Sequence, residues 1–136
     1  MASFNKFNCF VQDVGQKLHN LNSDALLVYL TNTAPVATNT VYNTPADLST
    51  GGGYTAGGAT IGSSAYSQTS GTASLTGSNV VFTATTGFGP FRYAVIYNNT
   101  SSTKPLIGWF DYGSSISLGA GESFTVAWGA NILTLA

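Results

Sequence analysis

The chain has 136 residues, the length of one ordinary domain, and only 7% of them are charged, against about 25% in a typical soluble domain. Four basic and five acidic residues give a net charge of -1, so the clustered Lys and Arg that free nucleic-acid binding needs are missing. A hydrophobic content of 43% also excludes a disordered chain solvated by its own charge. We therefore expect a single folded domain over residues 1–136, with polarity supplied by Ser, Thr, Asn and Gly.

Residues 1–22 carry the pattern of an amphipathic helix. Their apolar residues recur at spacings of about three to four, which places them on one helical face. These residues are Phe4, Phe7, Val11, Val14 and Leu18. Ser3 is a suitable N-cap, because its side chain can accept a bond from the first turn. The sequence thus predicts one N-terminal amphipathic helix followed by a β-rich body over residues 25–136.

From residue 25 onward, the spacing of the apolar residues no longer fits a helix. Residues 25–30 form a short apolar run with the length of a buried strand. At 44–48, Pro45 follows Thr44 and predicts a single helical turn. Six glycines within 49–64 predict a surface loop with positive φ at several positions. A phosphate-binding loop is excluded there, because no Lys flanks the glycines and no helix follows.

Short strands separated by turn signals fill the second half of the chain. We expect them at 65–69, 72–75, 79–85, 92–98, 106–112, 115–118, 123–128 and 132–135, with turns at 87–90 and 113–114 among others. Strand 92–97 is apolar on both faces and is therefore expected to be central. The regular spacing predicts a mainly β fold, either an antiparallel β-sandwich or a jelly-roll-like barrel.

The chain offers little material for catalysis or metal binding. His19 is the only histidine, and its place at the end of the expected helix predicts either a solvated side chain or a favourable charge at the helix C-terminus. Cys9 is the only cysteine and is predicted to be a small buried hydrophobe. Asp111 and Glu122 lie on neighbouring expected strands, but turn and cap roles explain the acids better than a glycosidase pair. We expect no catalytic residue, no metal and no cofactor, and hence a protein that is not an enzyme.

The remaining signal is adhesion to other proteins. Lys and Glu normally guard strand edges against pairing, and this chain has three Lys and one Glu. We therefore expect it to associate with itself and with a larger assembly. The candidate interface residues are Phe4, Phe7, Tyr42, Tyr54, Phe88, Phe91, Arg92 and Trp128. For the aromatic ones, packing inside the protomer stays open as the alternative.

Nothing in the sequence predicts a membrane partner. Residues 1–20 lack the apolar centre of a secretory signal, because Asp13 and other polar residues interrupt them. No run approaches the roughly 20 apolar residues of a membrane-spanning helix. We expect the protein to be made in a cytosol.

The sequence resembles a widespread group of small virion proteins of tailed bacteriophages, and the likeness runs nearly end to end. It is carried by FNKF at 4–7, LTNTAPV at 30–36, GYTAGG at 53–58, GPFRYAV at 89–95, PLIGWFDYGS at 105–114 and GESFTV at 121–126. The set is specific, although no single motif is diagnostic. Relatives carry an acidic residue after Phe-Thr-Val, whereas this chain has Ala127-Trp128, which indicates a drier local contact.

The resemblance implies a structural component of the particle. The expected role is a capsid decoration, or cement, protein that binds the major capsid protein on the outer capsid surface as a homotrimer. The family has no catalytic motif, and the chain would be made in the host bacterial cytoplasm. A tail, collar or fibre-tip component stays open as the alternative, the fibre tip as a host-glycan-binding module. A non-viral adhesin or lectin is a third reading.

Overall fold

The computed structural model describes residues 3–136 and is mainly β, with 46% of residues in strands and 8% in helices. The elements are β1 (Phe4–Lys6), α1 (Asn8–Gly15), β2 (Leu26–Thr31), the 3-10 turn η1 (Thr44–Ala46), β3 (Ala59–Thr60), β4 (Ala65–Thr69), β5 (Thr72–Thr76), β6 (Val80–Thr83), β7 (Gly87–Asn98), β8 (Leu106–Gly119), β9 (Ser123–Val126) and β10 (Leu133–Leu135). All strand pairs are antiparallel. The expectation of a mainly β, antiparallel protein with one α-helix is confirmed.

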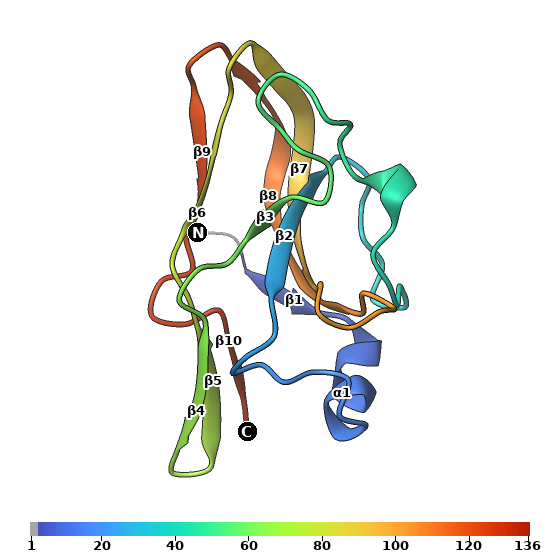
Figure 1. Cartoon of the computed structure of the whole chain (residues 1–136), viewed down its shortest axis with the longest axis vertical. Coiled ribbons are helices and arrows are strands. Elements are labelled where there is room, and N and C mark those ends of the chain that lie inside the picture. The colour runs from blue at the N-terminus through green and yellow to red at the C-terminus, as the bar shows by residue number, and fades with distance from the viewer. Residues whose placement is uncertain (1–2) are drawn as a thin grey trace.

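Three sheets make up the molecule. The largest has five strands in the order β1-β8-β7-β2-β3, and the smaller ones have the orders β10-β5-β4 and β6-β9. Figure 1 shows the two smaller sheets on one side of the five-stranded sheet, and α1 and η1 on the other. Within residues 3–136, no helix is long and apolar enough to cross a membrane.

Strand β7 is central, as its sequence predicts. It lies between β8 and β2 and buries residues on both of its faces. Ala94 and Ile96 belong to the main core beneath the smaller sheets. Val95 and Tyr97 belong to a second core on the opposite face, together with Phe7. The alternation of strand side chains thus builds two cores on one strand.

The expected N-terminal helix is shorter than predicted, and its start is wrong. Residues 4–6 pair with β8, with Phe4 opposite Phe110, and α1 begins only after Phe7. Ser3 is therefore not the N-cap. Phe4 packs against the main core and Phe7 lies in the second core, so the two rings lie on opposite faces of the five-stranded sheet. Side chains on one helical face would all point to the same core. In an extended segment, residues three apart point to opposite faces, so Phe4 and Phe7 reach different cores.

Two of the expected turns lie inside strands. Residues 87–90 belong to β7 and residues 113–114 belong to β8, which runs unbroken for 14 residues. The glycines at these positions predict turns from the sequence. In the structure the chain does not reverse there, and the pairing of the two strands shifts in register instead. The pairing of β7 with β8 shifts between Phe88 and Phe91 and again between Phe91 and Tyr93.

The glycine-rich segment 49–64 has the predicted positive φ angles but is not wholly a surface loop, since it contains β3 and buries Tyr54 and Ile61. Five of its glycines adopt positive φ: Gly51, Gly52, Gly53, Gly57 and Gly58. At Gly58 the backbone passes so close to β2 that a Cβ atom would lie 1.9 Å from the Val28 carbonyl oxygen. Only glycine fits this approach, which lets β3 pair with β2.

Candidate interaction surfaces

The two smaller sheets carry no charge. None of the strands β4, β5, β6, β9 and β10 contains Lys, Arg, His, Asp or Glu. No charged residue occurs between Asp47 and Arg92, or after Glu122. We call these five strands the neutral layer. The charged residues lie on β1, α1, β7 and β8 and in the connecting loops, where Glu122 directly precedes β9.

The outward face of β6 and β9 is small, carries no charged side chain and is partly apolar. Val81 is 56% exposed and lies opposite Thr125, which is also exposed. The alternate residues, Val80, Phe82 and Val126, point into the main core. Strand β9 thus has one buried face and one face open to solvent.

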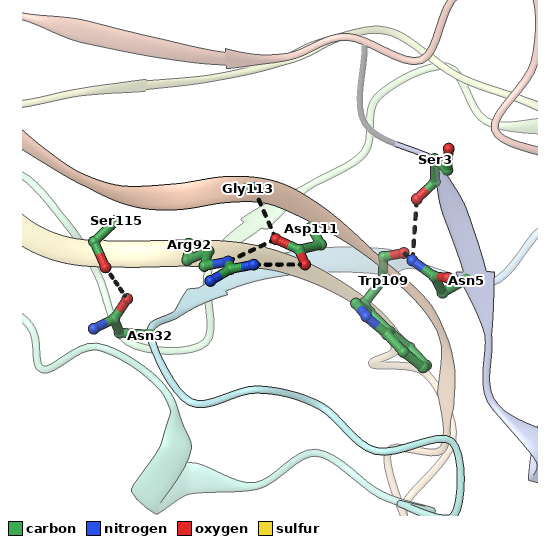
Figure 2. Close-up of polar contacts among 8 residues, drawn as sticks. All are labelled: Ser3, Asn5, Asn32, Arg92, Trp109, Asp111, Gly113 and Ser115. Carbon is green, nitrogen blue, oxygen red and sulfur yellow. Dashed lines mark hydrogen bonds and ion pairs between the residues drawn. The ribbon is translucent and has the colours of Figure 1, made fainter.

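The open face of the five-stranded sheet carries an ion pair from neighbouring strands. Arg92 donates from Nε to Asp111 Oδ1 over 2.8 Å and from Nη2 to Oδ2 over 3.1 Å, as Figure 2 shows. The Gly113 N–H also donates to Asp111, and the guanidinium lies 5.4 Å from the Tyr93 ring centroid. The hydrogen bonds between the two side chains lower the pKa of Asp111 and raise the pKa of Arg92. The pair is half-exposed and internally neutralised.

Uncharged polar contacts flank this ion pair on the same face (Figure 2). The Ser115 hydroxyl donates to Asn32 Oδ1 over 2.8 Å, which joins β8 to the end of β2. The Asn5 amide donates weakly to the Trp109 carbonyl oxygen over 3.5 Å. These groups stabilise the sheet and leave no buried charge on it.

Four of the eight candidate interface residues lie inside the protomer. Phe7, Tyr54, Phe91 and Trp128 are at most 4% exposed. Core packing, the alternative left open by the sequence, therefore holds for these four. For Trp128, the drier contact inferred from Ala127-Trp128 lies within the chain, where its indole N–H donates to the Ser78 carbonyl oxygen.

The other four candidates reach the surface in part. Phe4 and Phe88 are half-buried against the main core, and Tyr42 is half-buried against the second core. Arg92 is half-exposed but paired with Asp111. The structure does not bring these four together into one patch, since they lie on β1, β7 and the loop before η1.

Asp47 is the centre of a hydrogen-bond cluster that the sequence does not predict. Its carboxylate accepts from the Tyr42 hydroxyl over 2.6 Å, from the Tyr54 hydroxyl over 2.5 Å and from the Gly57 N–H over 2.6 Å. Tyr97 donates to the Gly57 carbonyl oxygen over 2.6 Å. Burial raises the pKa of Tyr97 to about 12, and the negative Asp47 adds to the shift. The cluster ties the glycine-rich loop to β7 and to η1.

A cavity of about 440 Å³ lies beside this cluster, beneath residues 33–43. Phe7, Tyr29 and Leu106 line its buried floor, and exposed residues such as Val36 and Asn43 line its rim. No Asp, Glu, Lys, Arg or His lines it. The cavity is in the range of small-molecule sites and suits a neutral ligand.

Backbone bonds hold the cavity wall in place. The Asn8 N–H donates to the Ala37 carbonyl oxygen, the Leu106 N–H to that of Thr40, and the Tyr42 N–H to that of Lys104. Cys9 is half-buried, not fully buried as predicted, and its thiol lies 3.6 Å from the Asn39 and Thr40 carbonyl oxygens. The wall is thus anchored to both α1 and β8.

His19 is buried, so the expectation of a solvated side chain is wrong. It is 8% exposed and packs on Phe10. The Asn98 side-chain oxygen accepts from the N–H groups of Thr100 and Ser101, so its amide nitrogen faces His19 Nδ1 at 3.0 Å. Nδ1 is therefore an acceptor and the proton lies on Nε2, which has no partner among residues 3–136.

Two further acids, Glu122 and Asp24, have structural partners. Glu122 accepts from the Gly119 N–H over 2.6 Å, and Asp24 accepts from the Asn98 amide over 2.7 Å. Within residues 3–136, no three His, Cys, Asp or Glu side chains gather in a way that suits a metal ion. The acids thus serve turns and loop contacts.

No known protein family, curated protein or solved structure matches this chain. The case for a function therefore rests on the surfaces described above.

The Asp47 cluster generates a first prediction, on Tyr54→Phe. The Tyr54 hydroxyl also accepts from the Leu30 N–H over 3.1 Å, so its loss leaves a buried donor and a carboxylate short of partners. We expect the free energy of unfolding in urea to fall by about 2–3 kcal/mol. The matched control is Tyr66→Phe, on the half-buried Tyr66 of β4, which should change it by less than about 0.5 kcal/mol. Equal losses in both variants would contradict the role of the cluster.

His19 generates a pH prediction. Burial lowers its pKa below 6.5, and the opposing charges of Asp13 and Asp24 do not reverse this. The unfolded chain therefore binds the proton at a higher pH than the folded chain, so stability is complete above about pH 6.5 and declines as the pH falls below it. We expect urea unfolding to show this decline between about pH 7 and 5 in the wild type and not in His19→Gln. An NMR titration of His19 that gave a pKa above 6.5 would refute it.

Proposed function

We propose that this chain is a structural protein of a tailed-bacteriophage particle, and that it decorates and stabilises the outer capsid surface. Its partners are further copies of itself, as a homotrimer, and the major capsid protein. The observation that carries the proposal is the neutral layer, in which none of the five strands contains a charged residue. The resemblance of the sequence to small virion proteins points the same way.

A neutral, threonine-rich side is unusual for a free protein and suits a protein packed among copies. Charged residues, Lys and Glu above all, are depleted at the centres of protein interfaces because burying them is costly. Many weak neutral contacts become strong when hundreds of copies are fixed on one shell. Such contacts also respond little to salt, because they do not depend on exposed charges.

The fold supports the same proposal. Two small antiparallel sheets lie on one side of a five-stranded antiparallel sheet, with a shared core between them. This arrangement is consistent with the proposed β-sandwich or jelly-roll-like architecture. A role without catalysis is supported by the engagement of Asp47, Asp111 and Glu122 in structural hydrogen bonds.

The test is the copy number in purified particles of the phage that encodes the chain. A decoration protein should be present in numbers on the order of hundreds, matching the capsid lattice. About 6 or 12 copies would overturn the capsid position and favour a tail or collar ring.

A pair of variants tests whether the neutral layer makes the contact. Val81→Lys and Thr125→Lys place charges on the outward face of β6 and β9 without touching the core. We expect both to lose most particle binding while keeping the melting temperature of the wild type. Val11→Lys, at a site 53% exposed on α1, is the matched control and should bind normally. Normal binding by all three would exclude this face as the contact.

The cavity beneath residues 33–43 favours the second candidate function, a fibre-tip module that binds host glycans. Its aromatic floor and its amide and hydroxyl rim suit a neutral sugar. A glycan array should then show binding to uncharged glycans, reduced at least about tenfold by Asn43→Ala, a loss of roughly 1.4 kcal/mol. Asn43 is exposed and makes no side-chain cap bond, so its loss should not affect folding. An array without signal would count against this candidate.

A further inference from the structure

Residues 18–24 lie between α1 and β2, and a side chain at the end of β7 holds this segment. Asn98, the last residue of β7, is fully buried. Its amide nitrogen lies 3.0 Å from His19 Nδ1, 2.7 Å from Asp24 Oδ2 and 3.4 Å from the Leu18 carbonyl oxygen. These contacts reach both ends of the segment, so Asn98 anchors it to the five-stranded sheet.

The segment is itself a hydrogen-bonded turn. The Asn20 N–H donates to Asp24 Oδ2 over 2.8 Å, and the Asn20 carbonyl oxygen accepts from the N–H groups of Ser23 and Asp24. The Asn22 N–H donates to Asn20 Oδ1 over 3.3 Å. Because these bonds hold the turn together, a displacement at one end also moves the other.

The segment caps the outer edge of β4. The Asn22 side-chain oxygen accepts from the Tyr66 N–H over 3.3 Å, slightly longer than the usual range of roughly 2.7–3.2 Å. Strand β4 pairs with β5 on its other side, so this amide occupies the outward backbone donor of Tyr66. The cap therefore depends on the position of the segment that carries it.

Protonation of His19 breaks the anchor of this segment. Neutral His19 accepts at Nδ1 from the Asn98 amide, whereas an imidazolium carries an N–H there, and two donors 3.0 Å apart repel each other. Turning the Asn98 amide over does not relieve the repulsion, because its side-chain oxygen already accepts from the N–H groups of Thr100 and Ser101. The contact between His19 and Asn98 is thus lost when the ring takes up a proton.

The charges that face His19 favour its protonation, and its burial opposes it. Asp13 presents a carboxylate from α1, and Asp24 presents another from the segment itself. Burial is the larger effect and lowers the pKa of His19 below 6.5. Lys17 is exposed and lines the cavity beside the ring, whose other walls, from β4 and residues 100–101, are uncharged. The ring is therefore neutral at neutral pH and takes up its proton on acidification.

We infer that protonation of His19 detaches the segment from Asn98 and releases Asn22 from β4. The Tyr66 N–H then faces solvent, so the outer edge of β4 is closed at neutral pH and open after acidification. This inference goes beyond the proposed function, since it needs neither a second copy nor a capsid.

The surroundings of the segment keep this opening local. A cavity of about 570 Å³ lies between the segment, Tyr66 and residues 100–101, so the segment has space in which to shift. Leu21 is only 4% exposed and packs in the main core. The segment therefore turns about Leu21 and does not leave the body of the molecule.

Amide hydrogen exchange followed by NMR tests the release. In the wild type, the protection factor of the Tyr66 amide should fall at least about fivefold between about pH 7 and about pH 5, while Ile96 in central β7 stays more strongly protected. In His19→Asn, whose amide oxygen replaces Nδ1 and does not titrate, Tyr66 should keep its protection. Constant protection of Tyr66 in the wild type would overturn the inference. So would protection equal to that of Ile96 at about pH 5, because the edge would then open only by global unfolding.

Linkage provides a second test, because coupling between two sites is reciprocal. If protonation weakens the cap, then removing the cap must ease protonation. We expect Asn22→Ala to raise the pKa of His19 in an NMR titration, by an increase in proton affinity of about fivefold.

The matched control for Asn22→Ala is Asn32→Ala. It also removes an exposed amide oxygen that accepts a hydrogen bond, here from the Ser115 hydroxyl over 2.8 Å, and should leave the pKa of His19 unchanged. The same His19 pKa in Asn22→Ala and the wild type would show that ring and cap are not coupled, and would refute the inference.

Discussion

The hydrogen bonds of the Asp47 carboxylate hold the two long loops of the molecule in place. It lies where the 33–43 segment, the glycine-rich loop and the five-stranded sheet meet, and it accepts from Tyr42, Tyr54 and Gly57. A half-buried negative charge needs several donors, and two tyrosine hydroxyls and a backbone N–H provide them without any cation. In this way a chain with few charges still fixes two long loops against its sheet.

The few charged residues are also unevenly distributed over the strands of the molecule. Several of the charged residues have structural partners: Arg92 pairs with Asp111, Asp24 accepts from Asn98, and Glu122 accepts from a turn. The neutral layer has no such groups, and its polar side chains are mostly Ser and Thr.

Local pattern predicts the elements whose neighbours in sequence are also their neighbours in space. The hairpin of β4 and β5 and the turn at η1 follow from alternation and turn chemistry. Phe4 and Phe7 mislead because a spacing of three fits a helix, while their different cores are visible only in three dimensions. His19 is missed for the same reason, since its partner Asn98 lies 79 residues away. Asp47 is missed although its partners lie within 10 residues, because no local pattern shows that the irregular loop folds back onto it. Their rarity in a weakly charged chain is the one signal that points to them.

The neutral layer treats its two exposed features differently. The outward face of β6 and β9 stays open, with Val81 56% exposed. The β4 edge is capped instead, because the Asn22 side-chain oxygen accepts from the outward-pointing Tyr66 N–H over 3.3 Å. An uncharged strand edge would otherwise invite pairing with another chain, and natural proteins normally guard it. Here an amide from the loop before β2 takes the place that Lys or Glu has in other proteins.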